Sequence, residues 1–372
     1  MSIRNRISQF LGFIVRSLLW SVHIGLFFYT LFIYYLLGTL TSEHWFASLL
    51  MITLPVAWLG LLGLGMLWLF VRPWRALLSV VGLLMGFWLW PRTVSFDLAS
   101  PNTSGQAVLQ LLSYNVSVFQ LDKFYEHQRV PASSVEMINW LVRHPAPVKC
   151  LQEFYTGDVA PAYQVAQRLD SAGYHHHAYL QPMNKGYIGV ATFSKYPILA
   201  QGRQGFGSFN GMVWTDIRVG ADTIRFINVH LQSMGIRVRR VFEKEEMDAM
   251  KAETRTVLGA LKAGFVARRT QVRVIETTIQ QSPYPVIVAG DFNDTPYGIV
   301  YERLRQRLRN AFEDAGTGFG FTLNRAPRFI RIDNQFYDAR RLQAVEFQTY
   351  RDVPYSDHYP VAGWYVKPKS GK

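Results

Sequence analysis

The first 98 residues of this 372-residue chain are almost free of charge, and they constrain its fold more than any other feature. Two stretches, 17–42 and 45–71, contain no Asp, Glu, Lys or Arg. Each is longer than the ~20 residues with which a helix crosses ~30 Å of hydrocarbon. We therefore expect residues 1–98 to form an N-terminal bundle of about three transmembrane helices. The charged residues of this region are Arg4, Arg6, Arg16, Glu43, Arg72, Arg75, Arg92 and Asp97.

A third apolar segment, 76–91, is shorter and reaches only about 24 Å at ~1.5 Å per residue. It spans a bilayer if Arg75 and Arg92 extend toward the headgroups and if Trp88 and Trp90 lie at the interface. The alternative is an interfacial or re-entrant helix. The expected helices cover about 17–40, 46–71 and 76–91.

The basic residues of the short loops predict the orientation of these helices. The N-terminus and the 72–75 loop carry arginines, whereas the 43–44 loop carries only Glu43 and His44. Basic loops stay in the cytoplasm. With three spans, the rest of the chain lies on the periplasmic side of a bacterial inner membrane, and without the third span it is cytoplasmic. We expect a multi-pass membrane protein with a periplasmic domain.

The remainder of the chain carries a surplus of positive charge. Of the chain's 39 basic and 26 acidic residues, 33 and 24 lie beyond residue 98, which leaves a net charge of +9 there. Such a surplus suits an anionic partner, such as a nucleic acid, a phospholipid headgroup or a phosphorylated small molecule, but it also serves simple solubility. The single cysteine, Cys150, lies in an apolar run, so we expect a buried thiol.

Several strand-like runs end in polar residues. The apolar run 286–289 stops at Gly290-Asp291-Phe292-Asn293, as expected for a buried strand that delivers an acid and an amide to its end. Similar runs end at Asn115, at Gln152-Glu153 and at His230, and Ser356-Asp357-His358 follows near the C-terminus. Hard divalent cations prefer carboxylate and amide oxygens. These patterns predict a hydrolytic metal site at one rim of a sheet.

The rest of the chain alternates strands and helices, which is typical of a layered α/β domain over 108–372 after a polar linker, 99–107. A basic, helix-rich stretch at 237–281 is expected to be a surface helix pair. The alternative is a basic face that follows the membrane or a polyanionic substrate. We expect strands at 111–115, 148–152, 188–194, 212–219, 224–230, 285–289, 342–349 and 361–366, and a helix at 133–142 capped by Ser133 or Ser134.

Six ordered segments together resemble the endonuclease/exonuclease/phosphatase superfamily, over about residues 108–366. The resemblance implies an α/β fold, a four-layer sandwich with two mixed β-sheets, and phosphoester hydrolysis with Mg²⁺ or Mn²⁺. The layout is similar to that of membrane-anchored bacterial members. The segments are Tyr114-Asn115, Gln152-Glu153, Asn228-Val229-His230, Gly290-Asp291-Phe292-Asn293, Arg331-Ile332-Asp333 and Ser356-Asp357-His358.

The chemistry of phosphoester hydrolysis suggests a role for each residue. The negative charge of the ester must be neutralised by a cation, a water must be activated, and the leaving oxygen must be supported. His358, held in one tautomer by Asp333, is expected near the phosphate, with His230 as a second acid–base group. The expected catalytic residues are Asp291, Asn293, His358, Asp333 and His230; the metal ligands are Glu153, Asn115 and Asp357; the substrate contacts are Asn184 and Tyr187.

Some of these residues have simpler explanations. Asp291 and Asn293 are also common turn residues that cap backbone groups. The run His175 to His177 does not predict a zinc site, because consecutive strand residues point to opposite faces, and we expect surface residues there. Two positions depart from the superfamily pattern. Ser117 stands where several members carry an acid, which leaves fewer protein ligands for the metal, and Asn334 replaces an apolar residue.

The expected function is that of a membrane-anchored phosphoesterase that depends on Mg²⁺ or Mn²⁺. Its substrate is a phosphoester, with nucleic acids and phospholipid or inositol phosphates both open, and its other partner is the lipid bilayer. No obligate protein partner is evident. The alternative is a catalytically silent membrane-anchored scaffold of the same fold. A silent relative is expected to lose at least one of Glu153, Asp291, Asn293 and His358, and all four are present.

Overall fold

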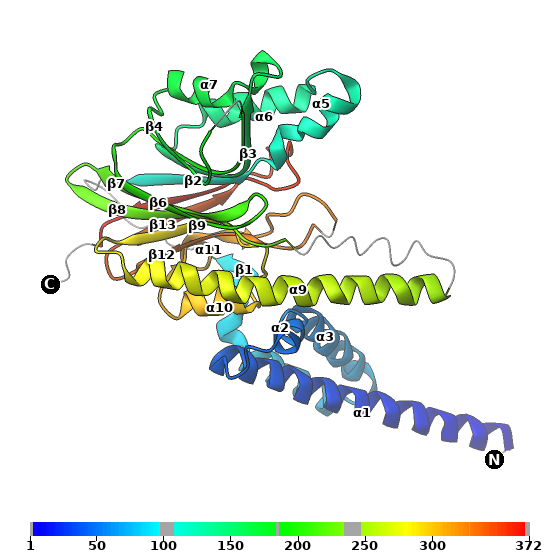
Figure 1. Ribbon diagram of the computed structural model, residues 1–372. Coiled ribbons are helices and arrows are strands. Elements are labelled where there is room, and N and C mark those ends of the chain that lie inside the picture. The colour runs from blue at the N-terminus through cyan, green and yellow to red at the C-terminus, as the bar shows by residue number, and fades with distance from the viewer. Residues whose placement is uncertain (1–2, 97–107, 184–185, 234–246, 327, 369–372) are drawn as a thin grey trace. The chain divides into compact units, whose positions relative to one another are not determined.

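The computed structural model describes residues 3–96, 108–183, 186–233, 247–326 and 328–368 (Figure 1). The side chains of residues 3–8 and 247–251 are not among the described parts. The chain divides into two compact units. One comprises Met1–Trp90 with Tyr297–Ile299, and the other comprises Pro91–Pro296 with Val300–Lys372.

The first unit is helical. Its helices are α1 (Ile3–Thr39), α2 (Trp45–Met51), α3 (Leu54–Val71) and α4 (Ala76–Met85). The helix expected over 46–71 is interrupted at Ile52 and Thr53, because Pro55 stands in the first turn of α3. Proline has no backbone N–H and is accommodated at a helix start rather than in a helix interior.

Two helical stretches of this unit are long and apolar enough to span a membrane, Gln9–Thr39 and Trp45–Val71, with mean hydropathies of 1.7 and 2.0. Large apolar side chains are exposed along them, including Leu18, Val56 and Phe70, which is 89% exposed. A contiguous exposed surface of this kind marks a membrane or protein interaction site. The apolar helices therefore fit a membrane anchor.

The third expected span is not supported. The α-helix there, α4, has 10 residues and reaches about 15 Å. A 3₁₀ segment, Phe87–Arg92, follows it. Arg92 does not extend toward headgroups either, because its side chain is buried in the second unit and donates to the Pro296 carbonyl at 3.0 Å. The periplasmic placement of the second unit rested on this span and loses that support.

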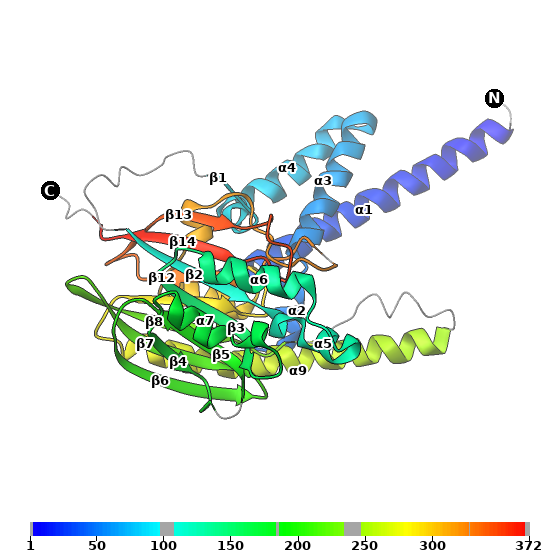
Figure 2. The ribbon, with the colours of Figure 1, turned by 90° about the horizontal axis from the view of Figure 1, so that it is seen from above.

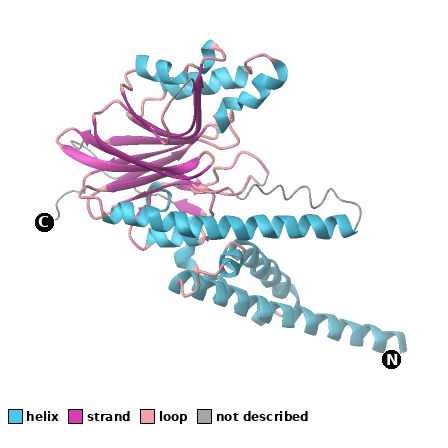
Figure 3. Cartoon of the chain, in the orientation of Figure 1, coloured by secondary structure: helices cyan, strands magenta, loops and turns pink. Residues whose placement is uncertain are grey.

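The second unit contains two six-stranded mixed sheets, as predicted (Figure 3). In each sheet one central pair is parallel, β2–β3 and β8–β9, and the other pairs are antiparallel. The first sheet has the order β13 (Gln343–Thr349), β14 (Val361–Val366), β2 (Leu109–Asn115), β3 (Val148–Gly157), β5 (Gly186–Ser194) and β4 (His176–Tyr179). The second has the order β10 (Arg309–Asn310), β12 (Asp333–Tyr337), β9 (Val286–Asp291), β8 (Asp222–His230), β7 (Asn210–Val219) and β6 (Ile198–Gly207).

Helices cover the outer face of each sheet, which gives four layers (Figure 1). Over the first sheet lie α5 (Leu121–His127), α6 (Ala132–Arg143) and α7 (Val165–Ser171). Over the second lie α9 (Met247–Gln280) and α10 (Ile299–Arg305), whereas α11 (Ala311–Ala315) packs against β13 and contributes Phe312 to the core between the sheets. The expected helix at 133–142 is α6, but Pro131 and not a serine precedes its first residue. The stretch expected to be a helix pair contains one continuous helix over its described residues, α9.

Apolar side chains from both sheets meet in a shared core. Leu111 and Cys150 of the first sheet belong to the same buried cluster as Phe226 and Ile287 of the second, so the thiol is buried as expected. Hydrogen bonds also join the sheets: Gln152 Nε2 donates to Asn228 Oδ1 at 2.7 Å. Because both side chains are buried, this bond fixes how the two sheets face each other.

The second unit begins before the expected linker. Strand β1 (Val94–Phe96) pairs with β11 (Thr317–Phe319) in a separate two-stranded sheet. Arg331 Nη2 donates to the Arg92 carbonyl at 2.6 Å. Residues 91–96 are therefore part of the fold of the second unit, whereas we expected the domain to start at residue 108.

We expect Arg92→Met to lower the thermal stability of the full chain strongly. Arg92 forms a buried ion pair with Glu302, and the loss of one partner leaves an uncompensated buried charge, at a cost of about 3–5 kcal/mol. Thermal unfolding in detergent measures the effect. Arg340→Met is the matched control, because Arg340 also pairs with an aspartate but is 83% exposed. Equal shifts of Tm in the two variants would contradict the prediction.

A second prediction concerns Lys149, whose side chain is fully buried in β3. Burial, with the nearby charge of Lys195, lowers the pKa of Lys149 to about 7. Between about pH 7 and 10 the unfolded chain holds a proton that the folded chain has released, so the free energy of unfolding rises with pH. Lys149→Met should therefore be stabilising at pH 7, and its advantage should shrink toward pH 10. Lys367→Met, at a 64% exposed position, should show no such trend in the same unfolding experiments.

Candidate active site

The polar strand ends predicted from the sequence meet at one rim of the second unit. Asn115 is the register partner of Gln152 in the first sheet, and His230 is the partner of Asp291 in the second. The carboxyl ends of parallel neighbours lie at the same edge of a sheet. Since the two sheets pack face to face, four strands deliver side chains to one place.

Gly290 allows β9 to approach β8 closely just before Asp291. Its φ is +144°, and a Cβ there would lie 2.0 Å from the Val229 carbonyl oxygen. Any other residue would have to push the two strands apart. The glycine of the Gly-Asp-x-Asn pattern therefore sets the position of the Asp291 carboxylate.

Glu153 reaches the rim through an irregularity in β3. The pairing of β3 with β5 shifts between Leu151 and Phe154, and Glu153 has a left-handed φ of +49°. Bulges of this kind re-aim a side chain, and such strain is often found at functional sites. The Glu153 side chain is 32% exposed, whereas that of Asp291 is 1% exposed. Glu153 is thus the acid of this pair that a ligand from solvent can reach.

Asp291 is held by several hydrogen bonds. Its Oδ1 accepts from the Asn293 backbone N–H at 2.8 Å, and its Oδ2 accepts from Asn115 Nδ2 at 3.0 Å. Asn293, with a φ of +48°, donates its Nδ2 to Oδ2 at 3.2 Å and to the Leu231 carbonyl at 3.0 Å. The Asp291 carboxylate is therefore held in one orientation.

Asn115 uses both ends of its amide at the rim. Its Oδ1 accepts from the Ser117 backbone N–H at 3.0 Å, and its Nδ2 donates to Glu153 Oε1 at 3.2 Å as well as to Asp291. An amide ligates a cation through its oxygen, and Asn115 Oδ1 accepts only one hydrogen bond among the described residues. In this structure Asn115 donates to both carboxylates, and its role as a metal ligand stays a prediction.

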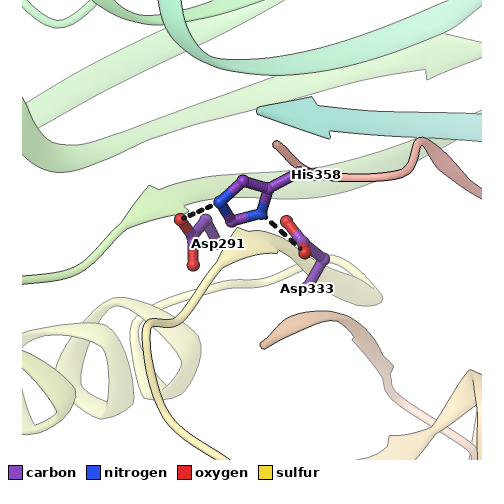
Figure 4. Close-up of side chains that lie close together, drawn as sticks. All are labelled: Asp291, Asp333 and His358. Carbon is purple, nitrogen blue, oxygen red and sulfur yellow. Dashed lines mark hydrogen bonds and ion pairs between the residues drawn. The ribbon is translucent and has the colours of Figure 1, made fainter. Parts of the chain in front are cut away.

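His358 and Asp333 form the expected pair (Figure 4). His358 Nδ1 lies 2.9 Å from Asp333 Oδ2, and Nε2 lies 3.8 Å from Asp291 Oδ2. Burial lowers the pKa of His358, but the charges of Asp333 and Asp291 outweigh it and raise the pKa to about 10. The ring is therefore an imidazolium at neutral pH, with a proton on Nε2 that faces Asp291.

His230 stands between the two acids of the rim. Its Nε2 lies 3.6 Å from both Glu153 Oε1 and Asp291 Oδ2. Its Nδ1 is buried, with no hydrogen-bond partner among the described residues. A neutral or charged imidazole at this position can donate from Nε2 to an oxygen atom placed between the carboxylates.

The remaining predicted residues lie elsewhere or face other partners. Asp357 Oδ2 lies 3.2 Å from Arg325 Nη1, and Asn184 falls outside the described residues. Tyr187 is buried, and its hydroxyl donates to the Val190 carbonyl at 2.6 Å, so a substrate contact is not supported. His175 is exposed, and its Nδ1 lies 3.0 Å from Asp170 Oδ1, which agrees with a surface role.

Two residues that support the site could not be identified from the sequence. Thr322 Oγ1 accepts from the Asp333 backbone N–H at 3.2 Å, and Arg268 of α9 donates Nη1 to the Gln232 carbonyl at 3.0 Å. Arg268 also lies 3.9 Å from Asp294, next to Asn293. Arg268 resembles the other arginines of its helix in the sequence, so only its burial distinguishes it.

A family model supplies the identification. The model of the Endonuclease/Exonuclease/phosphatase family matches residues 112–358, about two thirds of the chain. The chain belongs to this family. Membership supports hydrolase activity on phosphoesters and a general dependence on divalent metals. A domain of unknown function (DUF8431) matches residues 16–93. A search of the curated proteins finds no match.

Three solved structures show how far the fold is similar to known ones. A family member from Bacteroides thetaiotaomicron is 16% identical with a TM-score of 0.50, and the match covers 71% of this chain and 99% of that one. A protein from Beutenbergia cavernae is 15% identical, with a TM-score of 0.49 and coverages of 70% and 72%. Truncated TDP2 from Caenorhabditis elegans is 17% identical, with a TM-score of 0.47 and coverages of 70% and 98%.

The acids of this family member fit a divalent cation. Ligand atoms of Asp291, Asp333 and His358 lie within 4.8 Å of one another. Hydrogen bonds already join His358 to Asp333 and Asp291 to the Asn293 backbone. The Glu153 carboxylate, in contrast, is partly exposed to solvent. A cation beside Glu153 would balance the negative charges that gather at the rim. Glu153 is therefore a better candidate ligand than the buried trio.

Proposed function

We propose that the protein is a membrane-anchored phosphoesterase that hydrolyses phosphodiester or phosphomonoester bonds by in-line attack of water, with Mg²⁺ or Mn²⁺ as its cofactor. The observation that carries this proposal is the position of Glu153. Its partly open carboxylate lies within 3.6 Å of His230, whose Nε2 is equally close to Asp291. A cation site and an acid–base site thus adjoin at one rim.

The side chains divide the work by their chemistry. Asp291, held in place by its donors, orients and deprotonates a water molecule. Asn293 fixes Asp291 through its backbone N–H and side chain. The His358 imidazolium, with Nδ1 bound to Asp333, uses Nε2 to stabilise negative charge on the phosphoryl oxygens.

His230 and Glu153 complete the arrangement. His230 donates from Nε2 to an oxygen of the phosphoryl group or of the leaving group. Glu153 holds the divalent cation, which supplies charge neutralisation at a phosphoryl oxygen when it is bound. Asn115 keeps the Glu153 and Asp291 carboxylates at their separation by donating to both.

The proposal is tested with the full chain in detergent or nanodiscs, in the presence of Mg²⁺ or Mn²⁺. The panel contains plasmid DNA, single-stranded RNA, bis-p-nitrophenyl phosphate and phospholipid vesicles, with Asp291→Asn as the inactive variant. Metal-dependent hydrolysis of any member, lost in Asp291→Asn, is the expected result. Turnover that survives in this variant would contradict the assigned site. Absence of both turnover and metal binding would support the silent scaffold.

A further inference from the structure

Helix α9 extends far beyond the catalytic rim. Gln232, two residues after His230, accepts from Arg268 through its carbonyl, and its backbone N–H donates to Gln271 Oε1 at 3.0 Å. Residues 268–271 are therefore level with the rim. The 21 residues from Arg268 back to Met247 add about 30 Å of helix at ~1.5 Å per residue. Figures 1 and 2 both show this half of α9 running past the ends of the strands.

The projecting half of α9 buries none of its described side chains between Ala252 and Ala263. Leu258 and, closer to the rim, Val266 are each 42% exposed. Arg255 lies one turn before Leu258 and is also exposed. A helix that presents aliphatic and basic side chains side by side, without burying them in its own domain, has the chemistry of an interfacial helix.

Two loops of the same rim carry exposed phenylalanines. Phe209 forms the β6–β7 turn and is 47% exposed, and the adjacent Asn210 donates to Gln232 Oε1 at 3.1 Å. Phe329 is 69% exposed. Its neighbour Ile330 accepts from the backbone N–H of Thr322, the residue that holds Asp333. Both rings thus lie within a few residues of catalytic groups.

The loop of Phe329 also carries positive charge. Arg328 and Arg325 are exposed, and Arg325 is the residue that pairs with Asp357. Phenylalanine and arginine together suit the boundary between acyl chains and anionic headgroups. We define the rim surface by four apolar and two basic residues: Phe209, Phe329, Leu258 and Val266, with Arg255 and Arg328.

The bilayer is the partner that the chain itself brings near. The two candidate membrane spans end at Val71, and the helical unit that contains them ends at Trp90, directly before the first residue of the catalytic unit. A nucleic acid would also accept stacking on phenylalanine, but the exposed aliphatic residues of α9 offer nothing to a base or a phosphate. Charge and apolarity together favour an anionic lipid surface.

We propose that the rim surface contacts the lipid bilayer around the active site, and that the phosphoester hydrolysed there is carried by a lipid. Only one part of this inference, that the hydrolysed phosphoester is carried by a lipid, rests on the proposed function. Contact with the bilayer is a property of the surface, whether or not the site turns over. It brings a headgroup phosphate to Glu153 and His358 without lifting the lipid into water.

The first test measures contact without catalysis. The full chain is placed in nanodiscs of phosphatidylglycerol and phosphatidylcholine, and an environment-sensitive fluorophore is attached to Phe209→Cys, Phe329→Cys or Leu258→Cys. Cys150 is buried and stays unlabelled. Leu199→Cys is the matched control. Leu199 is 44% exposed and lies at the start of β6, whereas Phe209 follows the opposite end of that strand.

Quenching by spin-labelled lipid should be at least about twofold stronger at the three rim positions than at the control, because rim side chains insert beside the acyl chains. Equal quenching at all four positions would overturn the proposal. The result does not require turnover, so it separates failure of this inference from failure of the proposed function.

The second test measures substrate class. The double variant Phe209→Ser with Phe329→Ser should lower hydrolysis of a bilayer-embedded phosphodiester by about tenfold or more, because apolar insertion is lost. Hydrolysis of bis-p-nitrophenyl phosphate should change by less than about twofold, since no group of the site is altered. Loss of DNA or RNA cleavage instead, with lipid hydrolysis unchanged, would overturn the proposal in favour of a nucleic acid.

Discussion

Replacing Glu153 with Gln should lower turnover by about 10² or more, the usual loss when a group that stabilises the reacting charge is removed. The amide keeps the size of the side chain and still accepts from Asn115 Nδ2 through its oxygen, but it removes the negative charge. Affinity for Mn²⁺, followed by electron paramagnetic resonance or calorimetry, should fall in the same variant. Loss of a ligand charge acts on binding as well as on rate.

The matched control for Glu153→Gln is Asp158→Asn. Asp158 directly follows the end of β3, the strand that carries Glu153, and it is exposed. In the described part of the chain, Asp158 is not among the residues that contact His230 or Asp291. Turnover and Mn²⁺ affinity should stay within about twofold of the original, as is usual for surface substitutions. If Glu153→Gln kept both properties, the cation would have to lie elsewhere.

The second large effect is expected for His358. His358→Ala removes the imidazolium that faces Asp291 and leaves Asp333 buried without its partner. Loss of an acid–base group of this kind typically lowers the rate by about 10²–10⁴. The main change should be in kcat, because the group acts on charge that develops during the reaction.

Two further variants separate chemistry from folding in the His358 experiment. Asp333→Asn keeps the shape of the pair but removes the charge that holds the imidazolium, so it should lower kcat by a smaller factor. His175→Ala alters an exposed histidine and should leave kcat unchanged. A His358→Ala protein with normal kcat and a normal thermal transition would show that the histidine plays no part in the reaction.

The rim could be predicted from the sequence because strand endings are local signals. The run before Asp291 and the run before His230 each predict a strand from its apolar residues, and the polar residue that ends the run predicts where the strand stops. Their proximity follows because parallel neighbours end at the same edge, and the register places His230 opposite Asp291. The two mixed sheets were implied by the family resemblance, and the sheet topology of the structure confirms them.

Other parts of the site could not be predicted, because they depend on groups far apart in the chain. The orientation of Asn115 is decided by the Ser117 N–H and by two acids from other strands. The burial of Arg92 depends on Glu302, 210 residues later, so a snorkelling arginine and a buried one look alike in the sequence. The hydrogen bond from the Tyr187 hydroxyl to the Val190 carbonyl could not be foreseen either, because it depends on tertiary packing.

The burial of Arg92 bears on whether this enzyme could ever be freed from its anchor. Cleavage in the stretch 97–107, before the first strand of the large sheets, would separate Arg92 and β1 from the rest of the catalytic unit. Glu302 would then be left buried without its counter-charge, and Arg331 would lose a carbonyl partner two residues before Asp333. A shed, freely diffusing form would have to be cut before Pro91. Residues 91–96 therefore belong to the folded hydrolase and are not part of a removable tether.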